Sequence, residues 1–120
     1  MVRLKRTLSK DMGRTTSKYK NKKVVINGIK FDSLKEGNRY RELKLLERSG
    51  VISDLKLQVP YTLIEKSKYG REIKYIADFT YLEQGKLIVE DVKSPITRTP
   101  LYRLKKRLLA ERYNIIISEV

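Results

Sequence analysis

The 120-residue sequence contains no cysteine and no histidine. Their absence excludes disulfides, zinc fingers, thiolate or imidazole metal ligands, Ser-His-Asp triads and Cys-His nucleophiles. No apolar run approaches the roughly 18 residues of a membrane-spanning helix, and no apolar segment of the signal-peptide kind follows the basic N-terminus. Any catalysis must therefore use Asp, Glu, Lys, Tyr or a metal ion held by carboxylates.

Acidic residues are scarce beside basic ones. The chain has 28 Lys plus Arg against 14 Asp plus Glu, a formal net charge of +14 and a pI near 10.0. This excess goes far beyond what solubility requires, and nucleic acid is the usual partner of a small, strongly basic protein. An anionic membrane surface is the competing partner, but we expect no membrane association because no segment could span one.

The N-terminal segment has a composition of its own. Residues 1–22 are rich in Lys, Arg, Ser and Thr and show little apolar periodicity, which predicts a flexible basic arm ahead of a single domain at residues 23–120. The alternative is a solvated tail with no role. The candidate phosphate contacts in this arm are Arg3, Lys5, Arg6, Lys10, Arg14, Lys18, Lys20 and Lys22.

Two elements are predicted at the start of the domain. Residues 24–31 contain short apolar runs around an Asn-Gly pair, the strongest short-range signal for a hairpin. A helix then starts at Asp32 and Ser33 and continues to Gly50. Ser33 and Glu36 match a capping box, so Glu36 has a structural interpretation as the helix-capping partner of Ser33.

The second half of the domain is predicted to be mixed. Residues 52–57 and 61–64 look like strand segments bent at Pro60, residues 100–113 like a helix, and residues 115–117 like a short buried strand. The apolar stripe expected for this helix is Leu101, Leu104, Leu108 and Leu109. Its basic face, which includes Lys105, is either a solvated surface or a DNA contact.

Residues 76–93 are the most informative segment. They read as a hairpin with a Gln-Gly turn, in which Asp78 falls opposite Asp91 and shares one face with Asp91 and Lys93. Carboxylates so placed repel each other unless a cation lies between them, and their oxygens suit a hard ion such as Mg²⁺. The alternative is an ordinary ribbon with solvated acids.

Strand alternation also assigns the neighbours of these acids. Glu90 falls on the opposite face from Asp91, so we keep Asp91 as the site residue. The side chains predicted to share the face of Asp78 are Ile76, Leu82, Leu87 and Val89, and those predicted for the other face are Tyr75, Ala77, Phe79, Tyr81, Ile88 and Val92.

The order of these elements resembles a known family. A helix, a three-stranded meander, a helix and a strand, with Asp on the second strand of the meander and Asp-x-Lys on the third, resemble the PD-(D/E)XK nuclease superfamily. The chain is similar to its phage-type branch related to Holliday-junction resolvases, and to the nuclease subunit of Tn7-like transposition. Ala77 stands where the family name has proline. The segments that carry the resemblance are Phe31-Asp32-Ser33-Leu34-Lys35-Glu36, Leu57-Gln58-Val59-Pro60, Tyr75-Ile76-Ala77-Asp78-Phe79 and Val89-Glu90-Asp91-Val92-Lys93.

The resemblance implies a fold and a set of site residues. The fold is α/β with a restriction-endonuclease-like core, a mixed central sheet of an antiparallel meander and a further strand flanked by helices. Asp78 and Asp91 become ligands of Mg²⁺ or Mn²⁺ together with a backbone carbonyl near Val92. Lys93 faces the scissile phosphate or the attacking water, and Glu36 is an additional acid.

The implied function is a metal-dependent endodeoxyribonuclease that acts on branched DNA as a homodimer. We expect a cytoplasmic location, in the host cell if the chain is phage-encoded, since the absence of cysteine fits a reducing compartment. Gln58 is either a polar strand residue or a site residue that orients water or contacts DNA. The alternative function is a non-catalytic basic nucleic-acid-binding protein of similar fold.

Overall fold

The computed structural model of the chain describes residues 23–94 and 97–120. These described residues divide into two compact units, the first ending at Gly37 and the second beginning at Asn38. The predicted basic arm, with its phosphate contacts from Arg3 to Lys22, lies outside the described residues. Within the described ranges, no helix is both long and apolar enough to cross a membrane.

The first unit contains the predicted Asn-Gly hairpin. Strands β2 (Val24–Ile26) and β3 (Ile29–Phe31) pair antiparallel. The turn residues Asn27 and Gly28 have φ values of 52° and 78°. Positive φ at both central residues is the requirement of a type I′ hairpin turn, which explains why an Asn-Gly pair forms it.

Helix α1 (Leu34–Arg48) begins in this unit. The backbone N–H of Glu36 donates to the Ser33 hydroxyl at 3.1 Å, so Ser33 caps the helix as predicted. A methyl group at Gly37 would lie 2.8 Å from side-chain atoms of both Val24 and Ile26. Glycine at this position therefore lets the β2–β3 hairpin approach the first turn of the helix.

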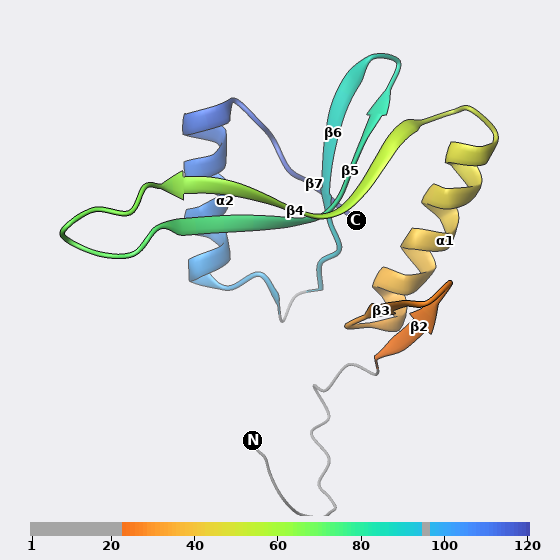
Figure 1. Cartoon of the computed structure of the whole chain (residues 1–120), viewed down its shortest axis with the longest axis horizontal. Coiled ribbons are helices and arrows are strands. Elements are labelled where there is room, and N and C mark those ends of the chain that lie inside the picture. Colours follow the sequence, from red (N-terminus) through yellow and green to blue (C-terminus); the bar gives the residue numbers. More distant parts are fainter. Residues whose placement is uncertain (1–22, 95–96) are drawn as a thin grey trace, which may run out of the picture. The chain divides into compact units, whose positions relative to one another are not determined.

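The second unit is built on a four-stranded mixed sheet. Strands β4 (Ser53–Ile64), β5 (Ile73–Glu83), β6 (Lys86–Asp91) and β7 (Ser118–Glu119) lie in that order, antiparallel except for the parallel β6–β7 pair (Figure 1). Two helices accompany these strands, so the fold class is α/β with a mixed sheet, as expected.

Helix α2 (Pro100–Tyr113) packs against β4 and β5. Thr99 caps its first turn by accepting the backbone N–H of Tyr102 at 3.1 Å, and Pro100 takes the first helical position, where its missing N–H costs nothing. The buried cluster on this side of the sheet comprises Leu63, Tyr75, Ala77, Val89, Tyr102, Leu109 and Ile117.

The predicted apolar stripe of this helix is wrong in part. Leu101 and Leu104 are 59% and 54% exposed, whereas Tyr102 and Leu109 are buried. The two buried residues are seven positions apart, so they lie on one helical face. Tyr102 occupies a core position because its ring is buried while its hydroxyl finds a carboxylate partner.

Two predicted strand boundaries also differ. Strand β4 continues through Pro60 as one 12-residue strand, and its residues with left-handed backbone geometry are Asp54 and Gln58, at φ 56° and 53°. The C-terminal strand is Ser118–Glu119 and not residues 115–117. Ile117 is buried and Ile116 is 75% exposed, so the isoleucine run supplies core packing just before the chain pairs with β6.

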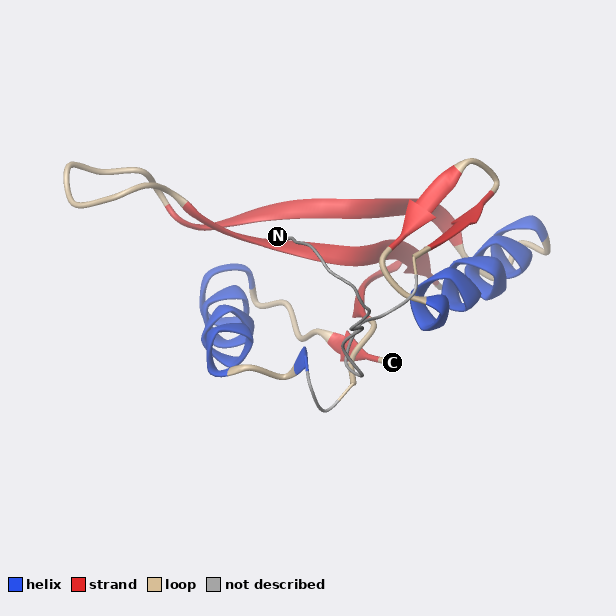
Figure 2. Ribbon diagram, turned by 90° about the horizontal axis from the view of Figure 1, so that it is seen from below, coloured by secondary structure: helices blue, strands red, loops and turns tan. Residues whose placement is uncertain are grey.

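The register of the central hairpin matches the prediction. Glu83 pairs with Lys86 and Phe79 with Glu90, and Gln84 and Gly85 form the turn with φ values of 52° and 76°. The predicted separation of faces fails, however, because Val89 packs in the same cluster as Tyr75 and Ala77. Strand β5 changes direction between the β5–β6 hairpin and the long β4–β5 ribbon (Figures 1 and 2). Alternation along a straight strand does not extend through this bend.

Candidate active site

Asp78, Asp91 and Lys93 lie around one cavity in the second unit. The cavity has a volume of about 400 Å³, and Tyr75, Tyr102 and Lys105 also line it. Strand β5 supplies Asp78, the end of β6 supplies Asp91, and Lys93 follows two residues later. Three residues that sequence alone predicted to converge therefore do so.

Asp91 is held by two neighbours. It is 5% exposed, and its Oδ2 accepts the Tyr75 hydroxyl at 2.8 Å and pairs with Lys93 Nζ at 3.2 Å. Burial, with the negative charge of Asp91, raises the pKa of Tyr75 well above its ordinary value, so this hydroxyl keeps its proton and remains a donor. The carboxylate of Asp91 is thus oriented by a hydroxyl donor and a cation at one oxygen.

Lys93 has a defined position despite its flexible side chain. The side chain is 12% exposed, and Nζ lies 3.9 Å from the centre of the Tyr102 ring. An aromatic face attracts an ammonium group by its negative quadrupole. Lys93 is therefore held between the carboxylate of Asp91 and the ring of Tyr102.

Asp78 is fixed to the neighbouring strand through the backbone. Its Oδ2 accepts the N–H of Val92 at 2.9 Å. The last residues paired between β5 and β6 are Phe79 and Glu90. The bond between Asp78 and Val92 extends the contact between these two parts of the chain beyond that pair. The backbone of Val92 consequently lies beside both Asp78 and Asp91.

A second set of contacts supports the Tyr102 ring. The Tyr102 hydroxyl donates to Glu119 Oε2 at 2.6 Å, and Lys106 and Arg98 reach the same carboxylate at 3.1 and 3.2 Å. The hydrogen bond from Tyr102, together with these two cations, lowers the pKa of Glu119 to about 2. Glu119 pairs with Asp91 in the β6–β7 register, so this carboxylate links α2 to the strand that carries the site.

Sequence reasoning missed Tyr75, Tyr102 and Glu119 as neighbours of the site. Their contacts depend on how α2 and β7 dock on the sheet, which no local spacing determines. One signal was present for Tyr102, because a tyrosine in the first turn of a helix, followed seven positions later by Leu109, indicates a buried ring with a polar end.

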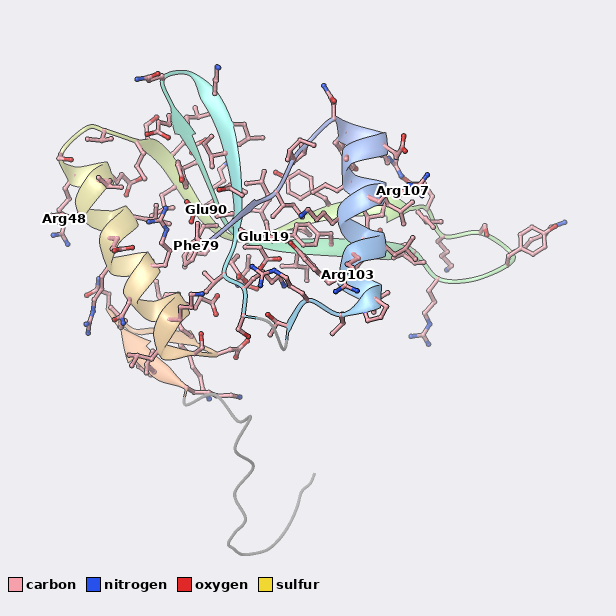
Figure 3. The ribbon with its side chains drawn as sticks, turned by 180° about the vertical axis from the view of Figure 1, so that it is seen from behind. Arg48, Phe79, Glu90, Arg103, Arg107 and Glu119 are labelled. Carbon is pink, nitrogen blue, oxygen red and sulfur yellow. The ribbon has the colours of Figure 1, made fainter. Side chains whose placement is uncertain are left out.

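Glu90 belongs to a different environment, as strand alternation predicted. It is 1% exposed and accepts two N–H groups of Arg39, one of them at 2.9 Å, and the hydroxyl of Tyr81. Figure 3 labels the side chain of Glu90 on the sheet. Hydrogen bonding to Glu90 raises the pKa of Arg39. Both oxygens of Glu90 are engaged, so this acid serves the structure and not the cavity.

The other predicted site residues have separate positions. Glu36 is 7% exposed and belongs to the first unit, so its role as an additional acid stays a prediction. Gln58 is exposed and falls opposite Asp78 in the β4–β5 register, between the pairs of Leu57 with Phe79 and Val59 with Ala77. Lys105 lines the same cavity as Asp78.

The side chains at the cavity can be compared with the ligands that a hard divalent cation takes in proteins. In residues 23–94 and 97–120, no group of three or more carboxylate, imidazole or thiolate side chains could hold a metal. Mg²⁺, however, usually keeps several waters and is bound by one or two carboxylates together with substrate phosphate. Two carboxylates at a cavity of about 400 Å³, with a backbone segment beside them, fit that pattern.

Comparison with known proteins identifies a family for this chain. A family model described as "Protein of unknown function (DUF1064)" matches residues 16–119. No curated protein and no solved structure matches the chain. The family match spans both units and all of the residues that line the cavity.

Proposed function

The chain belongs to the DUF1064 family, and we propose that it is a metal-dependent endodeoxyribonuclease that hydrolyses phosphodiester bonds in DNA. The observation that carries the proposal is the convergence of Asp78, Asp91 and Lys93 on one cavity. A formal net charge of +14 supports a polyanionic substrate.

The residues of the cavity have complementary roles in this proposal. Asp78 and Asp91 would hold Mg²⁺ or Mn²⁺ through their carboxylates, with the backbone of Val92 beside them. Such an ion lowers the pKa of a bound water and neutralises charge on the phosphate. The Tyr75 hydroxyl and the Val92 N–H keep the two carboxylates in fixed orientations.

Lys93 would contribute a second positive charge. Its ammonium group is already oriented by Asp91 and the Tyr102 ring, so little reorganisation is needed when a phosphate enters. Fixed charges aimed at the phosphate stabilise the additional negative charge that develops in the transition state. Glu36 is a further candidate acid within this proposal.

The remaining features of the proposal follow from the resemblance to PD-(D/E)XK nucleases. They are a restriction-endonuclease-like core, activity on branched DNA as a homodimer, and a cytoplasmic location in the host cell if the chain is phage-encoded. The strand order β4-β5-β6-β7, antiparallel and then parallel, supports the core assignment. Backbone contacts from the basic arm and from Lys105 would supply affinity without sequence preference.

A cleavage assay tests this function. Labelled duplex, single-stranded, flap and four-way DNA are incubated with the purified chain in Mg²⁺, in Mn²⁺ and in EDTA. Cleavage of at least one substrate with metal, and none in EDTA, is the expected result. Tight binding without cleavage of any substrate in either metal would contradict the proposal.

The second candidate function is a non-catalytic basic nucleic-acid-binding protein. The observation that favours it is the limited donor set, since no third acidic side chain joins Asp78 and Asp91 among the residues that the structure describes. In that case the acids would serve to position Lys93 and the end of β6. The same assay separates the two functions, because this candidate binds DNA and leaves it intact.

A further inference from the structure

The β4–β5 ribbon ends in a loop that carries its own concentration of positive charge. We define the ribbon tip as residues 65–72, which follow the last β4–β5 pair, Ile64 with Ile73, and are all exposed. The ribbon extends past α2, so the tip stands at the end of the second unit (Figures 1 and 2). Its basic residues are Lys66, Lys68 and Arg71.

The acids of the tip are neutralised by other groups. Glu65 pairs with Arg112 at 2.7 Å, and Glu72 pairs with Lys74 at 3.6 Å and accepts the Thr62 hydroxyl at 3.1 Å. In the described part of the chain, no acidic side chain forms an ion pair with Lys66, Lys68 or Arg71. The tip therefore presents three cations that are available to a polyanion.

The tip also exposes an aromatic ring. Tyr69 is 87% exposed, the highest value among the large apolar and aromatic side chains of the described residues. Lys68 Nζ lies 5.2 Å from the centre of its ring. A planar ring beside cations is the combination with which proteins bind the bases and phosphates of single-stranded nucleic acid.

Hydrogen bonds hold the backbone that carries this ring in place before any ligand binds. Ser67 and Gly70 exchange two backbone hydrogen bonds of 3.0 and 3.2 Å, and the Tyr69 N–H donates to the Ser67 hydroxyl at 3.1 Å. The end of β4, directly before the tip, is fastened to α2, where Arg112 donates to the Leu63 carbonyl at 3.1 Å and the Tyr113 hydroxyl to the Thr62 carbonyl at 2.7 Å. A preorganised surface loses less entropy on binding.

We infer that the ribbon tip is a second nucleic-acid contact, in which Tyr69 stacks on an unpaired base while Lys66, Lys68 and Arg71 neutralise phosphates. The inference rests on the proposed function for the identity of the partner. Strand β5 joins the tip to the cavity, and the seven steps along the chain from Arg71 to Asp78 span at most about 23 Å at 3.3 Å per step. This distance equals about seven steps of duplex DNA at 3.4 Å each, so one DNA molecule could contact both.

The test compares Tyr69→Ala with Tyr69→Phe in the full chain. Binding of a labelled single strand and of a blunt duplex is titrated in EDTA, so that cleavage plays no part. Tyr69→Ala should weaken single-strand binding by roughly 5- to 150-fold and duplex binding far less, while Tyr69→Phe binds as the wild type. Because Tyr69 is exposed, both variants should keep the wild-type melting temperature.

Charge variants sharpen the same test. Lys66→Gln, Lys68→Gln and Arg71→Gln should each flatten the dependence of log affinity on log salt by about 0.7 on the single strand. Lys86→Gln is the matched control, because Lys86 begins β6 directly after the turn of the other hairpin, opposite Glu83 in the strand register. It should leave the slope less affected than any tip variant.

Three results would overturn the inference: wild-type single-strand affinity in Tyr69→Ala, equal weakening on both DNAs, or equal loss in Tyr69→Phe. These results are distinguishable from failure of the nuclease proposal. If Tyr69→Ala binds like the wild type and the wild type cleaves DNA in Mg²⁺, only the tip assignment fails. If Tyr69→Ala loses single-strand affinity and the wild type cleaves nothing, the ribbon tip is a nucleic-acid contact of a non-catalytic binding protein.

Discussion

Two adjacent acids of β6, Glu90 and Asp91, are both buried but are held in different ways. Arg39 and Tyr81 together engage both oxygens of Glu90. Asp91 makes its hydrogen bond and its ion pair in the described residues through Oδ2 alone, and its carboxylate lines the cavity. The same strand thus carries one acid that serves the fold and one that lines a cavity of about 400 Å³.

The partners of these two acids show how the burial of a carboxylate can be interpreted. A buried carboxylate costs several kcal/mol in desolvation unless it is paired and hydrogen-bonded. For Glu90, the bidentate ion pair with Arg39 offsets the desolvation cost, and this geometry leaves no oxygen available to coordinate a metal ion. For Asp91, hydrogen bonding by Tyr75 and pairing with Lys93 at one oxygen offset the cost, and the carboxylate can still bind a further ligand.

The largest expected effect is the loss of cleavage activity when residues that line the cavity are substituted. Asp78→Asn and Lys93→Ala should each reduce Mg²⁺-dependent cleavage by about 10³-fold, since they remove a metal ligand and a charge at the phosphate. DNA affinity should remain largely intact, because it comes from phosphate neutralisation elsewhere. Single-turnover cleavage and binding in EDTA measure the two quantities. Full cleavage by both variants would leave only the binding-protein function.

Removal of the neighbouring acid should act on stability instead. Glu90→Ala removes the buried carboxylate that Arg39 and Tyr81 share and leaves Arg39 with its exposed ion pair to Glu42. Breaking a buried ion pair in this way typically costs about 3–5 kcal/mol. Urea denaturation measures the free energy of unfolding. Asp91→Asn is the comparison, with a smaller loss, because the amide can still accept a hydrogen bond from Tyr75. A Glu90→Ala variant as stable as Asp91→Asn would show that the two acids are not distinguished in this way.

The predicted basic arm should contribute affinity and not stability. Deleting residues 1–22 should flatten the plot of log affinity against log salt by about 0.9 for each phosphate of duplex DNA that the arm neutralises, while the thermal midpoint barely changes. Salt-dependent titrations and melts of both chains provide the measurement. An unchanged slope would show that the arm does not touch DNA, and a large drop in midpoint would show that it is part of the fold.

The smallest expected effect is a pH dependence at Glu119. Its pKa is lowered to about 2 by Tyr102, Lys106 and Arg98, so the unfolded chain binds this proton more readily than the folded one. Its contribution to stability is therefore fully present above about pH 4.5 and is lost as the pH falls toward 2. Melts of the wild type and Glu119→Gln should differ most near neutral pH and converge in acid. A constant difference across that range would contradict this assignment.

Much of the local structure could be predicted from the sequence. The turns at Asn27 and Gln84 follow from residues that tolerate positive φ, and the second of them sets the register that brings Asp78 toward Asp91. The capping of α1 by Ser33 is equally local. Each of these features depends on a few consecutive residues, which is why pattern and propensity were sufficient.

Features that depend on docking could not be predicted. The face that α2 buries follows from the fit of Tyr102 and Leu109 against the sheet and from the bond to Glu119. Helical periodicity alone selected Leu108 and Leu109 correctly, but it also selected the exposed Leu101 and Leu104. The bend of β5 places Val89 with Tyr75 and Ala77. Strict alternation assumes a straight strand, so it separated residues that the bend brings together.

The most direct test compares the two neighbouring acids in one assay. Asp91→Asn, Glu90→Gln and the wild type are incubated with labelled four-way, flap, duplex and single-stranded DNA in Mg²⁺, and cleavage is expressed per folded molecule after the folded fraction has been measured by denaturation. The account predicts that Glu90→Gln cleaves like the wild type and that Asp91→Asn does not cleave. Cleavage by Asp91→Asn at the wild-type rate would contradict the claim that the cavity at Asp78 and Asp91 is the site of chemistry.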